Sequence, residues 1–196
     1  MTATSGLLVT AGFFAGIAFS GERSITVHLH DYVGVSPETM SEARQVATDV
    51  LATAAVGVDW RQAQTAAVLL PPQGSTEFVM RLLPEPPPTE KRLRRSVLGY
   101  VQPTGEGHRR WLASIYFPRV SLLAGTLNVP AATLLGYAIA HELGHLLIGP
   151  RDHSLSGLMR CPWGSAELRE ACRGRLRFVP GEAVFSALAP PSKYFR

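Results

Sequence analysis

The first part of the chain has an apolar pattern that predicts a strand followed by a long helix. Ile25–Leu29 (ITVHL) alternates apolar and polar residues, as a half-buried strand does. Ser36 is a good N-cap for a helix that has Pro37 at its first position. Apolar residues then recur at helical spacing through about Ala55, which indicates one face directed at a core. The residues of this face are Met40, Ala43, Val46, Ala47, Val50, Leu51 and Ala54.

Three further apolar segments predict strands. One begins at Gly57–Trp60, the second is Thr76–Leu83, and the third is Trp111–Phe117, which Pro118 ends. The segment Pro84–Pro88 cannot join a sheet, because proline lacks the N–H that a ladder requires. It is therefore expected to be a surface loop or a linker.

A second long helix is the clearest element of the chain. Pro130 fits its first turn, and the apolar run to Ile148 contains no helix breaker except isolated glycines. Gly149 and Pro150 then end the helix. Another helix begins near Ser165. This order of elements predicts an α+β domain.

The composition is that of a folded domain rather than a disordered or fibrous chain. The chain has 196 residues, of which 46% are hydrophobic and 17% are charged, so it can bury a core. The net charge of +4 is not gathered in one continuous basic stripe. We therefore interpret the basic residues as solvated loop charge, and expect no nucleic-acid partner.

The N-terminus has the features of a secretory signal. Gly6–Phe19 carries no charge and is too short to span a bilayer as a helix, but it matches the apolar core of a signal peptide. Ala18 and Ser20 are small residues at the two positions that a signal peptidase reads. We predict a signal peptide over residues 1–20, one domain over 21–196, export to the periplasm or the medium, and no stable membrane span. The alternative is a buried first strand or helix in a cytoplasmic protein.

The two cysteines, Cys161 and Cys172, form no CxxC pair, which excludes a four-cysteine zinc site. In an exported protein a disulfide between them is the natural expectation, whereas in a cytosol both stay as thiols.

The second long helix carries the sequence HELGH at His141–His145. Residues i and i+4 of a helix share one face, so these two histidines aim their imidazoles at one point and supply half of a tetrahedral zinc site. Glu142 can reach a metal-bound water and take its proton as the water attacks a carbonyl. Burying these three side chains in so apolar a helix costs several kcal/mol without partners, and a metal removes that cost. The alternative is two core histidines bonded to backbone or water.

The stretch from His141 to Met159 resembles the HExxH zinc metallopeptidases, or zincins, and most of all their metzincin branch. In that branch the active-site helix ends at a glycine, a third histidine follows, and a methionine-containing turn passes under the metal. The resemblance implies that Gly149 is the turn, His153 the third ligand and Met159 the methionine. The connection is two residues longer than in that family, and Cys161 stands near where a tyrosine often follows.

The sequence leaves the third ligand open. Besides His153, the candidates are Glu167 or Glu170 on the following helix, as in glutamate-ligated zincins, and Asp152. Met159 is either the turn methionine or ordinary core filling. His28, His30 and Asp31 lie together on the first strand, as a polar strand face or as a second metal site.

The resemblance implies a single zincin-like domain with a mixed twisted sheet, a long backing helix and an active-site helix. It also implies a zinc-dependent metalloendopeptidase that acts on a peptide or protein. The alternatives are a zinc hydrolase of a non-peptide amide, such as a deformylase-like or deacylase-like enzyme, and a non-catalytic zinc module that binds peptides. Trp111–Phe117 matches the edge strand that pairs with substrate in zincins, unless it is a central strand without a free edge.

Overall fold

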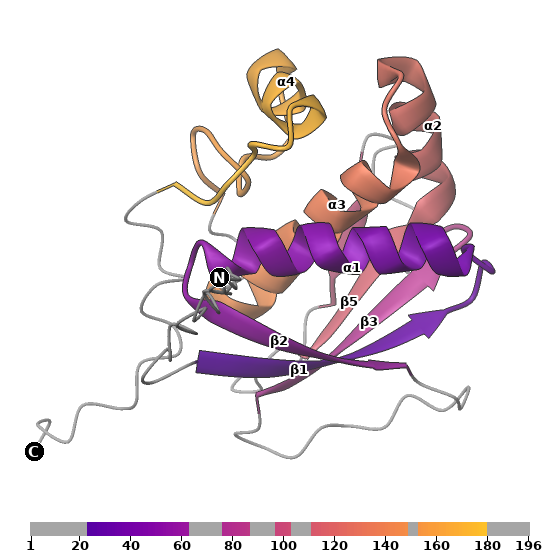
Figure 1. Cartoon of the computed structure of the whole chain (residues 1–196), viewed down its shortest axis with the longest axis vertical. Coiled ribbons are helices and arrows are strands. Elements are labelled where there is room, and N and C mark those ends of the chain that lie inside the picture. Colours follow the sequence, from indigo (N-terminus) through magenta and orange to yellow (C-terminus); the bar gives the residue numbers. More distant parts are fainter. Residues whose placement is uncertain (1–22, 63–75, 87–96, 103–110, 149–152, 180–196) are drawn as a thin grey trace, which may run out of the picture.

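A computed structural model describes residues 23–62, 76–86, 97–102, 111–148 and 153–179 (Figure 1). These residues form an α+β fold with a five-stranded, mostly parallel sheet and four helices. The expected signal peptide and the expected helix end at Gly149 and Pro150 lie outside the described residues. The elements are β1 (Arg23–Asp31), α1 (Pro37–Ala52), β2 (Val56–Gln62), β3 (Glu77–Leu83), β4 (Gly99–Val101), β5 (Leu112–Tyr116), α2 (Phe117–Leu127), α3 (Ala131–Ile148) and α4 (Ser165–Cys172).

The strands lie in the order β2-β1-β3-β5-β4. The first four in this order run parallel, and β4 pairs antiparallel with β5 at the edge of the sheet. The segment Trp111–Phe117 is therefore not an edge strand. All five residues of β5 are buried between its two neighbours, and among the described residues the edge on this side is β4.

The first strand and helix follow the sequence pattern. Ile25, Val27 and Leu29 of β1 are at most 1% exposed, as the alternating pattern predicts. The hydroxyl of Ser36 accepts a hydrogen bond from the backbone N–H of Thr39 at 3.2 Å and so caps α1. This helix ends three residues earlier than the apolar pattern suggests, because a turn follows Ala52 before β2 begins.

Two elements were not predicted. β4 has only three residues, too few for any periodic signal. α2 begins at Phe117, directly after β5, so no loop separates strand from helix. The sequence predicts that Pro118 ends a strand, but this residue lies in the first turn of α2, where proline's fixed φ favours a helix.

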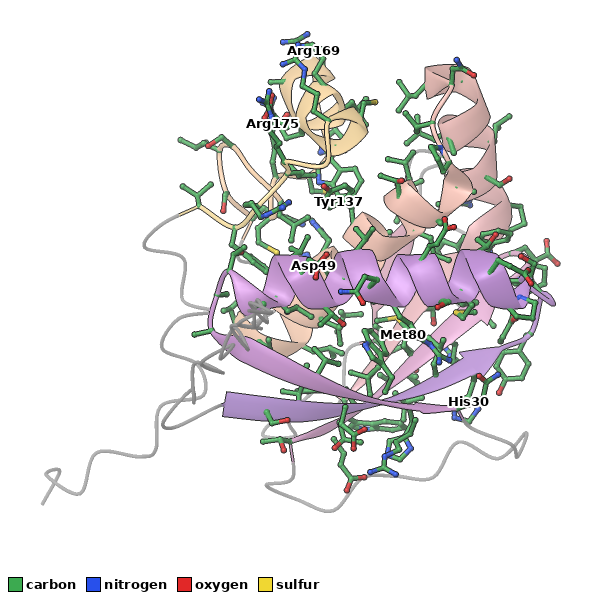
Figure 2. All side chains as sticks on the ribbon, viewed as in Figure 1. His30, Asp49, Met80, Tyr137, Arg169 and Arg175 are labelled. Atoms are coloured by element: carbon green, nitrogen blue, oxygen red, sulfur yellow. The ribbon has the colours of Figure 1, made fainter. Side chains whose placement is uncertain are left out.

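The core lies between the sheet and the helices on one of its sides. Figure 1 shows α1 crossing the sheet with α3 beside it, and in Figure 2 Met80 of β3 lies in the layer between α1 and the sheet. Nearly every residue of α3 from Ala132 to Leu146 is buried. By length and composition α3 could cross a membrane, but 78% of it is buried in the protein, and core helices meet the same criteria.

The crossing of α1 and α3 depends on a glycine. A Cβ at Gly136 would lie 2.5 Å from Cβ of Val46 and 2.7 Å from the carbonyl oxygen of Ala43. The two backbones therefore approach closely because Gly136 has no side chain.

We expect Gly136→Ala to lower the free energy of unfolding by about 1–3 kcal/mol, because the added methyl group overpacks the helix crossing. Urea denaturation measures this change. The control is Gly125→Ala in α2, where a Cβ meets nothing within 4 Å, so stability should stay equal or rise by up to about 1 kcal/mol. A Gly136→Ala protein as stable as the parent would mean that the helices do not cross so closely.

Candidate metal centre

α3 carries three buried polar side chains, and the two histidines among them meet at one point inside the protein. His141, Glu142 and His145 are only 5–8% exposed. The Nε2 atoms of His141 and His145 lie 3.1 Å apart, as the one-turn spacing predicts. Both imidazoles therefore converge in a buried location, where unpartnered polar groups would be costly.

His153 reaches the same point from the loop that follows α3. Its Nε2 lies 3.1 Å from Nε2 of His145, and the three histidines offer ring nitrogens that all lie within 4.8 Å of one another. Within the described part of the chain, this is the only group of three or more metal-ligating side chains with such geometry. The three histidines could hold a metal ion.

The tautomer of His141 leaves its Nε2 available to a metal ion. A carbonyl oxygen can only accept, so Nδ1 of His141 donates to the carbonyl of Leu158 at 2.7 Å and Nε2 keeps its lone pair. Burial, reinforced by the neighbouring His145, lowers the pKa of His141 to about 3, so its ring stays neutral at pH 7. Two nitrogens bound tetrahedrally to Zn²⁺ at about 2.0–2.1 Å are separated by about 3.3 Å, close to the distances found here.

The carbonyl of Leu158 organises the loop around the cluster. Besides the bond from His141, it accepts a hydrogen bond from Nε1 of Trp163 at 2.9 Å. The backbone N–H of Leu158 donates to the carbonyl of Arg177 at 2.8 Å, which ties the loop to the chain after α4. A second partner of this kind orients a metal-binding histidine and selects its tautomer.

Met159 lies directly against α3. It is fully buried, and a Cβ at Gly144 would be 2.5 Å from its sulfur. Gly144 stands next to His145, so the methionine packs beside the helix turn that carries both histidines. The contact places Met159 next to the cluster, where it also fills the core.

Glu142 faces the edge strand. A Cβ on Gly99 of β4 would lie 2.6 Å from Oε1 of Glu142, so the carboxyl group rests against the strand backbone. Burial raises the pKa of Glu142 to about 8. A bound cation would favour its ionised form.

Glu142 and the three histidines open into a cavity of about 740 Å³. Its walls come from β4, α2, α3, the loop after Met159 and α4, and among the described lining residues Glu142 is the only acidic one. The remaining lining residues are Val97, Leu98, Gly99, Tyr100, Val101, Arg119, Leu122, Leu123, Thr126, Ala138, Arg160, Cys161, Pro162, Trp163 and Leu168. The sequence pattern pointed to none of the β4 and α2 residues in this wall, because only the sheet order brings them to α3.

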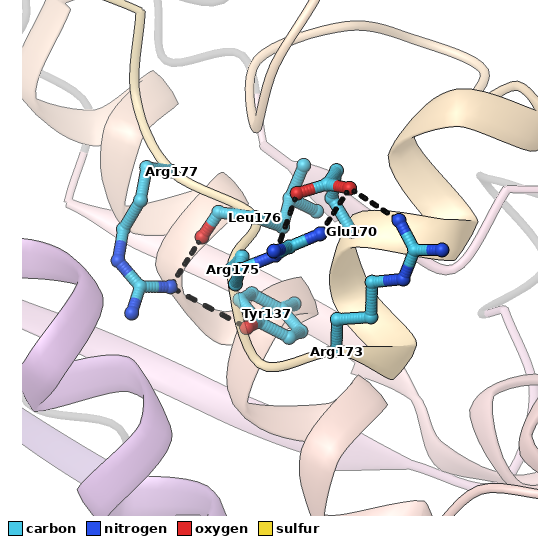
Figure 3. Close-up of polar contacts among 6 residues, drawn as sticks. All are labelled: Tyr137, Glu170, Arg173, Arg175, Leu176 and Arg177. Carbon is cyan, nitrogen blue, oxygen red and sulfur yellow. Dashed lines mark hydrogen bonds and ion pairs between the residues drawn. The ribbon is translucent and has the colours of Figure 1, made fainter.

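The two glutamates considered as third ligands are engaged elsewhere. Oε2 of Glu167 accepts a hydrogen bond from the backbone N–H of Gly164 at 3.0 Å and pairs with Arg160 at 3.4 Å. Burial alone would raise the pKa of Glu167. Hydrogen bonds from backbone N–H groups, including that of Gly164, and the charge of Arg160 instead lower this pKa. Glu170 binds Arg173 and Arg175, as Figure 3 shows. Neither belongs to the histidine cluster, and Asp152 and Gly149 lie outside the described residues.

The first strand carries no second metal cluster among the described residues. Nε2 of His28 lies 3.2 Å from a carboxylate oxygen of Glu77, and His30 stacks on Tyr32. The carboxylate of Asp31 accepts hydrogen bonds from three backbone N–H groups of the turn that follows β1. These contacts make a polar strand end rather than a ligand set.

The expected disulfide is not formed. Cys161 and Cys172 are both exposed free cysteines. Cys161 lines the cavity, whereas Cys172 is the last residue of α4, a helix that carries it about 10 Å from Ser165.

Loss of the third histidine should weaken metal binding. We expect His153→Ala to lower zinc affinity by more than about 100-fold. Mutation of a residue that only hydrogen-bonds a metal ligand already lowers metal affinity by about 10–100-fold, and loss of the ligand itself should cost more. Titration of zinc against a competing chelator measures this. Glu170→Ala is the matched control, because Glu170 contacts only arginines in the polar network of Figure 3, and it should bind zinc like the parent. Normal zinc affinity in the His153 variant would exclude it as a ligand.

No protein family model matches this sequence, and no curated protein or solved structure is significantly similar to it.

Proposed function

We propose that this protein is a zinc-dependent metalloendopeptidase, with His141, His145 and His153 as the ligands and Glu142 as the general base. The observation that carries the proposal is the convergence of three histidine nitrogens beside a buried glutamate, at the wall of a large cavity. We also propose that the arrangement is zincin-like. In it, α3 is the active-site helix, β4 is the edge strand beside this helix, and Met159 packs against the helix.

Zinc is the metal that this donor set suits best. Three imidazole ligands and one remaining position are typical of catalytic zinc sites. A zinc ion held by these residues would supply Lewis acidity to a carbonyl and a water at the site. The hydrogen bond from His141 to Leu158 holds one of the ligands in the required tautomer before any metal arrives.

Glu142 is suited to moving a proton at this point. Its carboxyl group is 5% exposed and lines the cavity next to His141, so it can take a proton from an attacking water and return it to the leaving nitrogen. A protein that only binds peptides needs no buried carboxylate, and burying one without a function costs free energy. The glutamate therefore favours catalysis over a non-catalytic zinc module.

The surroundings favour a peptide over a small amide. A cavity of about 740 Å³ is within the range of sites that enclose drug-sized ligands, and is far larger than a formyl group requires. β4 stands at the edge of the sheet and lines this cavity, so an extended peptide could pair with it as an added strand. A deformylase-like or deacylase-like activity is the second candidate.

Removing the base should separate catalysis from metal binding. We expect Glu142→Gln to lower kcat/KM on a fluorogenic peptide library by about 10²–10⁴-fold while zinc content stays at one ion per chain. The substitution keeps the size of the side chain and removes only its basicity. A Glu142→Gln enzyme with full activity would disprove the mechanism, and activity that survives a chelator would disprove the role of the metal.

The part of the cavity wall that α2 forms should select substrates with apolar side chains. Leu122 is 75% exposed yet lines the cavity, so it has apolar surface free for a ligand. We expect Leu122→Lys to lower kcat/KM about 10-fold for peptides with a large apolar residue beside the scissile bond. Leu155→Lys is the control, since Leu155 is 96% exposed and is not among the lining residues. Equal effects of both variants would contradict this selectivity.

A further inference from the structure

We propose that Gly99 of β4 is a positioning residue for Glu142: the absence of a side chain at this place in the edge strand determines where the carboxylate lies. The inference rests on the proposed function, because position matters only if Glu142 transfers protons. The contact itself can be tested without any activity.

The evidence is the space around Gly99. A Cβ there would lie 2.6 Å from Oε1, 2.8 Å from Cγ and 2.9 Å from Cδ of Glu142. Cβ atoms essentially never approach other heavy atoms within 3.0 Å, so the outer part of the glutamate occupies the place of the missing side chain. Gly99 is not among the glycines with positive φ, so any residue could adopt its backbone conformation. The glycine is therefore needed for room rather than for a special turn.

The strand cannot retreat to make that room. Gly99 pairs with Ile115 in the ladder between β4 and β5. On one side of it, the backbone N–H of Tyr116 donates to the carbonyl of Leu98 at 2.8 Å. The guanidinium of Arg119 in α2 donates to the carbonyl of Val97 at 2.7 Å. These bonds hold β4 to β5 and to α2.

The helix cannot retreat either, since α3 is buried on nearly every side. A methyl group at position 99 would therefore displace the flexible glutamate side chain, while both backbones stay in place. Proton transfer needs the base within about 2.6–3.2 Å of the proton's heavy atom, and a displacement of about 1 Å can cost on the order of 10²-fold in rate.

The test compares Gly99→Ala with the parent and with Gly125→Ala, the same substitution at an open helix position that does not line the cavity. For Gly99→Ala we expect kcat to fall by about 10–100-fold, with KM within about threefold of the parent and zinc content unchanged. A crystal structure of the variant should show the Glu142 carboxyl group moved from β4. Gly125→Ala should keep both kinetic constants.

A double-mutant cycle gives a readout without catalysis. We expect Gly99→Ala to lower Tm in the parent but not in Glu142→Ala, where the added methyl group enters vacated space. If Gly99→Ala alone fails to fold, folding of the double variant supports the contact, and failure of both overturns it. A Gly99→Ala enzyme with parental kcat, or equal Tm changes in both backgrounds, overturns the inference and leaves the proposed function standing. A parent without hydrolytic activity overturns the proposed function instead, and the cycle still decides the contact.

Discussion

The structure depends on one constraint: a helix buried on almost all sides carries two histidines and a glutamate. α3 packs in the core against α1 and the sheet, so its two histidines and its glutamate are only 5–8% exposed. Buried polar groups need partners, and charged ones need them most. The hydrogen bond from His141 to the carbonyl of Leu158 and the approach of His153 to His145 supply such partners to the two histidines.

The loop after α3 turns this requirement into a site. The carbonyl of Leu158 accepts hydrogen bonds from both His141 and Trp163, and its N–H is bound to the chain after α4. Gly157 precedes Leu158 and has a φ of +77°, and Val179 leaves no room for a Cβ there. The backbone conformation and the close packing at this turn therefore both favour glycine. The one-turn spacing on α3 brings His141 and His145 together, and these contacts hold the loop at Leu158 beside them, as partners behind metal ligands generally do.

The edge of the sheet and α2 complete the surroundings of the histidines. β4 is short, but its ladder to β5 and the bond from Arg119 fix it beside Glu142. α2 follows β5 without a loop and supplies the exposed Leu122 to the cavity wall. An apolar wall, a strand edge and a buried base next to one another are what hydrolysis of an extended peptide would use.

Local sequence determined the elements whose signals lie within a few residues: the alternation of β1, the capped α1, and the two histidines one turn apart on α3. It also indicated His153 as a candidate ligand, although Glu167 and Glu170 remained open, because no local pattern shows which side chains other groups will engage. Only the tertiary structure decided that these glutamates bind backbone and arginines, and that β5 is central while the three-residue β4 forms the edge. The physical reason is the same throughout: periodicity and capping act within one element, whereas strand order and close packing depend on contacts between residues far apart in the chain.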